Sequence, residues 1–167
     1  MLSLAVPTAI FDELSRQMTG GREEQVAFLY VSVEGERLLA IELSQVPPEG
    51  FLSQSARHLA LTDEMRAKVL GRAAALDACV VEAHSHPGAK EACFSPTDLA
   101  GFEEWVPHVR WRLGGVLYAA LVFAGHEVDA LAWRGAGPAP EALGYLEVGD
   151  RIIRPSNLTI EHLSSER

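Results

Sequence analysis

Apolar and polar positions alternate along this chain in blocks that predict short strands and amphipathic helices. Apolar runs rich in β-branched residues predict strands at residues 2–6, 26–33, 37–43, 57–61, 78–83, 116–124, 128–133 and 151–153. Apolar residues at helical spacing predict helices over residues 9–18, from Thr62 to about 75, and over 96–106. We expect a loop at residues 44–53 and a loose end from Ser164. The order of elements favours one α/β or α+β domain, a curved mixed sheet flanked by helices.

The strand predicted at residues 78–83 leads into His84-Ser85-His86-Pro87. Residues two apart on a strand project from the same face, so the two imidazoles are expected side by side. Pro87 lacks an N–H and ends the strand there. Asp98 is the candidate for a third ligand. Two imidazoles and one carboxylate leave the fourth position of a zinc ion open for water, as in catalytic sites.

The segment Ser95-Pro96-Thr97-Asp98 is also typical of a helix N-terminus. Serine is a common N-cap, proline is favoured at the first helical position, and an acid at the third completes a capping box. The two roles are compatible, because a cap orients Ser95 while the first helical turn directs Asp98 back towards the histidines.

The pattern His-x-His-Pro, seven residues, Ser, two residues and Asp resembles the motif of JAMM (JAB1/MPN) zinc metalloproteases. The matching residues are His84, His86, Pro87, Ser95 and Asp98. The resemblance covers roughly residues 1–135, which leaves 136–167 as a C-terminal extension of a single domain. It implies the JAMM fold, zinc held by both histidines and Asp98, and a Ser95 hydroxyl that donates to the oxyanion of the reaction.

The same resemblance implies a catalytic glutamate far upstream, followed three residues later by a small residue. Glu24 and Ala27 fit this pattern, although Val26-Ala27 replaces the common Cys-Gly. Glu24 would accept the proton of the metal-bound water and deliver it to the leaving amine. Glu23 is the weaker alternative, because the residue three positions after it is Val26.

Family members with this motif cleave after the Gly-Gly tail of ubiquitin or a ubiquitin-like protein, so the resemblance implies an isopeptidase or peptidase of that kind. A chain of this length is similar to stand-alone prokaryotic JAB-domain proteases. Those occur in operons with ubiquitin-like proteins and their activating and conjugating enzymes, some of which serve antiviral defence. Two alternatives stay open: a sulfur-carrier-protein peptidase using the same site, and a non-catalytic MPN scaffold that only binds partners.

Several further residues near the motif have open roles. Cys93 is a conceivable zinc ligand but lies outside the matched spacing, and Glu82 is either a partner of His84 or an ordinary salt-bridged acid. Phe94 and the loop at residues 47–51 are candidates for lining the channel of the substrate tail. No functional role is predicted for the other histidines, which are His58, His108, His126 and His162.

The net charge argues against one class of partner, and the expected lack of targeting signals indicates where the protein is located. A net charge of −9 argues against nucleic acid, because phosphate-backbone affinity requires clustered Lys and Arg. We expect neither a signal peptide nor a membrane span, since no charged n-region precedes an apolar core and no apolar run reaches the length of a span. The two cysteines do not make a disulfide framework. A reducing cytoplasm is the expected location.

Overall fold

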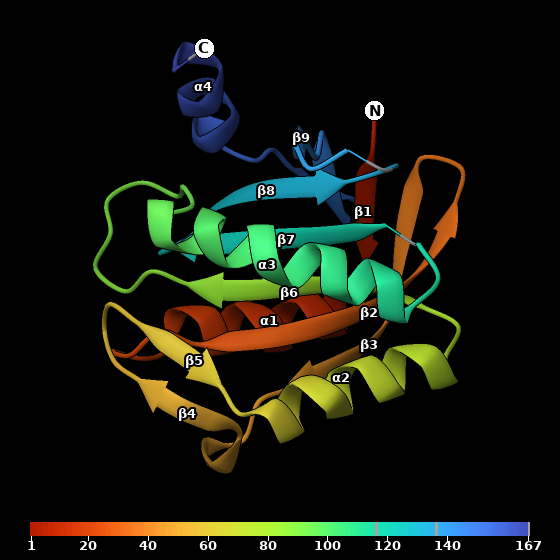
Figure 1. The fold of residues 1–167 in the computed structure, drawn as a ribbon. Coiled ribbons are helices and arrows are strands. Elements are labelled where there is room, and N and C mark those ends of the chain that lie inside the picture. Colours follow the sequence, from red (N-terminus) through yellow and green to blue (C-terminus); the bar gives the residue numbers. More distant parts are fainter. Residues whose placement is uncertain (116, 136, 167) are drawn as a thin grey trace.

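The computed structural model describes residues 1–115, 117–135 and 137–166, and within them a large mixed sheet lies between helices (Figure 1). The strands of this sheet are β1 (Ser3–Val6), β2 (Val26–Glu34), β3 (Arg37–Gln45), β6 (Cys79–Ser85), β7 (Tyr118–Ala124), β8 (Glu127–Trp133), β9 (Glu141–Ala142), β10 (Tyr145–Val148) and β11 (Arg151–Ile153). Their order is β11-β10-β1-β3-β2-β6-β7-β8-β9, and β4 (Phe51–Gln54) pairs with β5 (Leu59–Leu61) in a second, two-stranded sheet. The helices are α1 (Thr8–Thr19), α2 (Asp63–Ala75), α3 (Pro96–Arg112), α4 (Leu158–Ser165) and the short 3-10 helix η1 (Pro48–Gly50).

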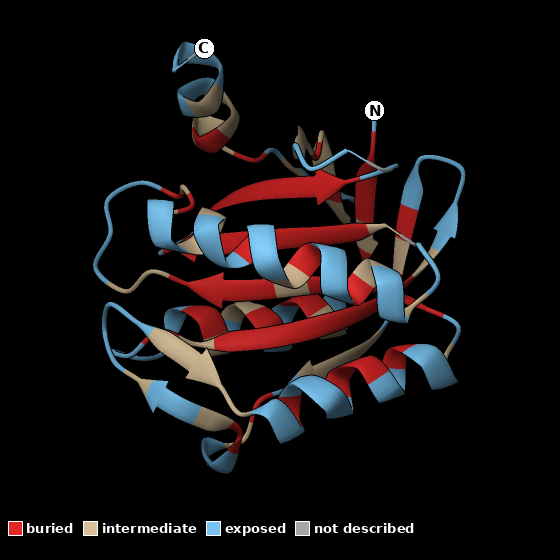
Figure 2. Cartoon of the chain, viewed as in Figure 1, coloured by how far each residue is buried: buried red, intermediate tan, exposed pale blue. Residues whose placement is uncertain are grey.

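Each face of the large sheet has its own hydrophobic core. Helix α1 covers one face with Phe11, Leu14 and Met18, which recur at helical spacing. Helices α2 and α3 cover the other face, where Val69 and Phe102 are among the buried residues. Figure 1 shows α1 behind the sheet and α2 and α3 in front, and Figure 2 shows that the central strands are buried while the outer sides of these helices are exposed. The prediction of a mixed α/β domain is confirmed.

Strand β6 lies beside β2, the middle strand of the large sheet; it carries His84, and His86 follows its last residue. It runs antiparallel to β2, with His84 opposite Val26, and parallel to β7. All but one of its residues are buried, as expected for a strand covered on both faces. His84 is therefore held inside the protein, where its ring position is set by packing.

Helix α3 is longer than its sequence pattern predicts. The predicted end near Val106 is wrong, because the helix continues through Pro107 to Arg112. Proline removes a helical N–H and usually ends a helix. Here Val109 is fully buried and extends the apolar stripe of Phe102 and Val106 by another turn, so burial against the sheet outweighs the lost hydrogen bond.

Two predicted irregular regions contain regular structure. The loop predicted at residues 44–53 is shorter, because β3 extends to Gln45 and β4 begins at Phe51. The loose end predicted from Ser164 is wrong for the described residues up to 165, which belong to α4. Residues 145–148, which the sequence pattern did not mark, form β10 and pair in parallel with β1. Val116, the predicted start of a strand, lies outside the described residues.

No helix among the described residues combines the length and apolar character needed to span a bilayer.

Candidate metal centre

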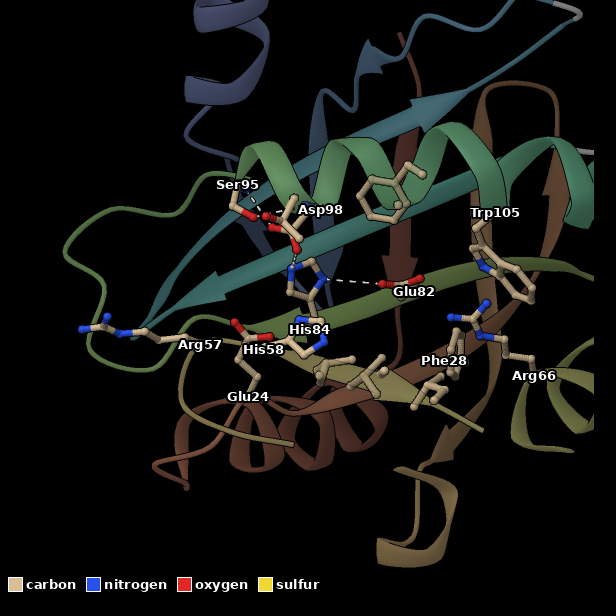
Figure 3. Close-up of a pocket in the computed structure, with 17 residues that line it drawn as sticks. Glu24, Phe28, Arg57, His58, Arg66, Glu82, His84, Ser95, Asp98 and Trp105 are labelled. Atoms are coloured by element: carbon tan, nitrogen blue, oxygen red, sulfur yellow. Dashed lines mark hydrogen bonds and ion pairs between the residues drawn. The ribbon is translucent and has the colours of Figure 1, made fainter. Parts of the chain in front are cut away.

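Three side chains meet just beyond the end of β6: His84 in the strand, His86 directly after it and Asp98 in the first turn of α3. Figure 3 shows His84 and Asp98 pointing toward one another. The Nε2 atoms of His84 and His86 lie 3.3 Å apart. The Asp98 carboxylate lies 3.4 Å from His84 Nε2 and 3.1 Å from His86 Nε2. Ligand atoms about 2.0–2.1 Å from a tetrahedral zinc ion are separated by ~3.3 Å. The group could therefore hold a metal ion, and the predicted closeness of these three residues is confirmed.

The ends of β2 and β6 are locked together by the serine between the two histidines. Ser85 is buried, and its Oγ accepts a hydrogen bond of 2.9 Å from the Gln25 N–H. The Ser85 N–H donates to the Gln25 carbonyl at 3.0 Å. This exchange fixes Glu24, the neighbour of Gln25, beside the histidines, although the two segments are far apart in sequence.

The start of α3 is a capping box, as predicted, and the same contacts orient the metal-site carboxylate. Ser95 Oγ accepts from the Asp98 N–H at 3.1 Å, and Asp98 Oδ2 accepts from the Ser95 N–H at 2.7 Å. The Asp98 carboxylate thus spans the gap between the helix terminus and the two imidazoles. These two hydrogen bonds hold the carboxylate at the start of α3.

The charges around this point favour a cation. Burial acts to lower the pKa of His84, but the nearby carboxylates of Asp98 and Glu82 outweigh it and raise that pKa to about 10. Burial acts to raise the pKa of Asp98, but contacts with His84 and His86 outweigh it and hold that pKa below its ordinary value. A positive charge is thus stabilised here, and a divalent ion can replace the proton, because metal ligands bind in their deprotonated forms.

Glu82 has a defined place on the other side of the His84 ring. Its Oε1 lies 3.6 Å from His84 Nδ1, and its Oε2 accepts a 2.7 Å hydrogen bond from the Tyr118 hydroxyl. The same hydroxyl accepts from Trp105 Nε1 at 3.1 Å. A carboxylate at Nδ1 favours the tautomer that leaves Nε2 free to bind a metal. Glu82 thus forms an ion pair with His84, although His84 Nδ1 has no hydrogen-bond partner among the described residues.

Glu24 is a buried acid at the edge of the same cleft. It is 7% exposed, and burial raises the pKa of its carboxyl, with His84 and His86 acting in the opposite direction. Its backbone is tied to the β4–β5 hairpin, since its N–H donates to the Ser55 carbonyl and its carbonyl accepts from Gln54 Nε2. A raised pKa suits a group that takes up a proton near neutral pH.

The cleft beside these residues has a volume of about 420 Å³ and runs between β5 and α3. Phe28 and Phe102 are among its apolar lining residues. Arg66 and Trp105 lie at the end away from Glu24 (Figure 3). Arg66 stacks over the Trp105 ring at 5.2 Å. The cleft is elongated, open and mostly apolar, which suits an extended chain.

The geometry places several neighbouring residues and corrects one expectation, the lining of the substrate channel. Glu24 lines the cleft, whereas Glu23 is exposed and does not. Cys93 is not part of the metal-ligating group among the described residues. Phe94 and residues 47–51 do not line the cleft; residues 57–61 form that wall instead.

Sequence reasoning missed three contributors to the site. The role of Ser85 could not be predicted, because nothing in the sequence distinguishes a serine between two ligands from a residue that only separates them. His58 and Arg57 come from the β4–β5 turn, and only the folding of that hairpin over the sheet brings them to the cleft.

Comparisons with known proteins describe the fold only. No protein-family model matches the sequence, and no curated protein matches it. Among solved structures, the chain is similar to the solution structure of protein DSY2949 from Desulfitobacterium hafniense, at 13% sequence identity and a TM-score of 0.58. The similarity covers 89% of this chain and 94% of that chain. At this identity the likeness shows that the two chains share an overall fold.

Proposed function

We propose that this protein is a zinc-dependent isopeptidase or peptidase of the JAMM type, which cleaves after the C-terminal tail of a ubiquitin-like protein. The observation that carries the proposal is the meeting of His84, His86 and Asp98 at one point, with Glu24 and Ser95 on the wall of the same cleft. Zinc is proposed because the ligand set is rich in imidazole and leaves a position open.

The residues divide the chemistry between them. A zinc ion bound here supplies Lewis acidity, which polarises the scissile carbonyl and acidifies water. Glu24 accepts a proton from the attacking water and returns it to the leaving amine. The Ser95 hydroxyl donates to the oxygen on which negative charge develops, a contribution of about 2.7–4 kcal/mol in comparable sites.

The elongated cleft between β5 and α3 supports an extended substrate. A peptide tail with small residues beside the scissile bond would let the carbonyl approach the His84–Asp98 side of the cleft. The tail of a ubiquitin-like protein, which ends in Gly-Gly, has this property. The proposal also implies, as further partners, the enzymes that activate and conjugate this ubiquitin-like protein.

The test separates metal binding from catalysis. The wild-type protein, loaded with Zn²⁺ and dialysed, is expected to hold about one zinc per chain, and His86→Ala is expected to lose it. Glu24→Gln should keep the zinc and lose ~10²–10⁴-fold in turnover of a Gly-Gly peptide linked to aminocoumarin. Glu23→Gln is the matched control and should retain both. Elemental analysis that finds no zinc in the wild type would refute the metal site, and normal turnover by Glu24→Gln would refute the assigned base.

A further inference from the structure

A fully buried carboxylate lies outside the metal centre and is not explained by the proposed chemistry. Asp129, on β8, is 0% exposed. Its Oδ1 accepts from the N–H groups of Ala130 and Asn157, each at 3.0 Å. Its Oδ2 accepts from the N–H and the hydroxyl of Thr159, at 3.0 and 2.6 Å. A buried charge is costly unless it is fully hydrogen-bonded, and these four donors meet that condition.

The carboxylate of Asp129 acts as the cap of helix α4. The residue at the N-cap position, Asn157, has a left-handed backbone with φ of 61° and makes no side-chain cap bond. Asp129 takes its place from the neighbouring strand, and a negative charge at a helix N-terminus is favourable. The Ser156 N–H also donates to the Val128 carbonyl at 2.9 Å. The chain just before α4 is therefore fixed to β8.

The same segment contacts the loop that leads into the metal centre. The Phe94 N–H donates to Thr159 Oγ1 at 2.9 Å, and Ser156 Oγ donates to the Ala92 carbonyl at 2.6 Å. The Thr159 hydroxyl thus donates to Asp129 and accepts from Phe94 at once. We call residues 156–159 together with Asp129 the C-terminal clasp.

The two loop residues that the clasp holds lie directly before the site. The Phe94 ring packs edge-on against the His84 ring, with centroids 5.5 Å apart, and against Phe102 at the same distance. Ser95 follows Phe94 and forms the capping box with Asp98. A shift of the Phe94 backbone would therefore move the ring that supports one ligand and the serine that orients another.

We propose that the C-terminal clasp is a positioning element for the metal centre: it holds the 92–95 loop so that His84, Ser95 and Asp98 are preorganised. Its effect on turnover rests on the proposed function, whereas its effect on the loop does not. The chain thereby makes its active geometry depend on residues near its C-terminus, far in sequence from the motif.

The experiment measures the loop directly by amide hydrogen exchange of the full-length, metal-free protein. Thr159→Val removes the hydroxyl and keeps the shape, so the Phe94 amide is expected to exchange roughly tenfold faster. Thr159→Ser keeps the hydroxyl and should restore the wild-type rate. Ser156→Ala should also speed exchange in the 92–95 segment, whereas Ser164→Ala, whose exposed hydroxyl bonds within α4, should not. Exchange in β2 is the internal reference for folding.

The second readout is zinc affinity, measured by competition with a chelator. Thr159→Val and Ser156→Ala are each expected to weaken zinc binding about tenfold, in the range found for outer-shell partners of metal ligands. Unchanged loop exchange in both variants would overturn the clasp, and faster exchange with unchanged zinc affinity would overturn its link to the site. A wild-type protein that binds no zinc would count against the metal site alone, and the exchange comparison would still decide on the clasp.

Discussion

Ser95 and Asp98 use the same atoms for helix formation and for the metal centre. In the capping box, Ser95 Oγ and Asp98 Oδ2 each accept a backbone N–H within the first turn of α3. The Asp98 oxygens also face both imidazoles. Stability and function therefore overlap at these residues, and a matched cap elsewhere in the chain is needed to separate them.

Ser95→Ala is expected to reduce both stability and turnover. Loss of the cap should cost about 0.5–2 kcal/mol in the free energy of unfolding. Loss of the oxyanion donor should lower kcat by roughly 10²–10³-fold. Denaturant unfolding and turnover of the aminocoumarin peptide measure the two effects.

The control for Ser95 is Thr62→Ala at the start of α2. Thr62 Oγ1 accepts from the Met65 N–H at 3.1 Å, the same bond length as in the Ser95 cap, and Thr62 does not line the cleft. This variant should lose similar stability and keep its kcat. A Ser95→Ala protein with the stability loss alone would show that Ser95 is only a cap.

Glu82→Gln is expected to weaken zinc binding by ~10–100-fold while the protein stays folded. Glutamine keeps an acceptor for the Tyr118 hydroxyl but removes the charge that faces His84 Nδ1. Chelator competition measures the affinity. The matched control is Glu42→Gln on β3, which disrupts an exposed ion pair with Arg72 and should leave zinc affinity unchanged. Equal affinity in the wild type and Glu82→Gln would show that Glu82 does not support the ligand.

At the scale of elements, the two faces of the large sheet have separate tasks. The face under α2 and α3 opens into the cleft, whereas the face under α1 is a closed core. Changes under α1 should therefore affect the stability of the sheet without altering the local geometry of the site.

Leu14→Ala in α1 is expected to lower the free energy of unfolding by about 2–5 kcal/mol, because Leu14 is fully buried and leaves a cavity. The folded fraction should bind zinc with the wild-type affinity. Leu52→Ala is the control: this leucine is 76% exposed, and its removal should change stability by less than about 0.5 kcal/mol. A similar loss in both variants, measured by denaturant titration, would contradict the assigned core.

At the scale of the whole molecule, burial of Glu24 makes the free energy of unfolding depend on pH. Burial raises the pKa of Glu24 above 4.5, so the native state holds a proton that the unfolded state has already released. The free energy of unfolding contributed by this group therefore falls as pH rises from about 4.5 through the native pKa. A buried base is kept at the expense of stability.

Glu24→Gln should remove the loss of stability that ionisation of the buried Glu24 carboxyl causes. In chelator-treated protein, we expect the variant to gain stability relative to the wild type as pH rises through that window, with a constant difference above it. Urea unfolding at several pH values measures the difference. The exposed neighbour Glu23 provides the control substitution, Glu23→Gln. The same pH-dependent gain in both variants would contradict the assignment to Glu24.

Local features of the chain could be predicted from sequence because neighbouring residues determine them. The β-branched run before His84, the stop at Pro87 and the cap at Ser95 each depend on a few adjacent positions. The mixed α/β class followed from the order of such elements. The expected meeting of Asp98 with the histidines also held, because a strand end and a capped helix start are joined by a short loop.

The remaining features were decided by contacts between distant segments. The extension of α3 past Pro107 depends on burial of Val109 against the sheet. Ser85 accepts a hydrogen bond from the N–H of Gln25, which is sixty positions away in sequence. This bond holds Glu24, the residue before Gln25, near the histidines. Asp129 fixes the start of α4 to β8 because its buried carboxylate needs hydrogen-bond donors, which Asn157 and Thr159 supply. Thr159 and Ser156 in turn hold the loop before Ser95. Buried polar groups need hydrogen-bond partners, and buried apolar groups need packing partners, anywhere in the folded chain. Only the tertiary structure therefore determines which distant residues become these partners.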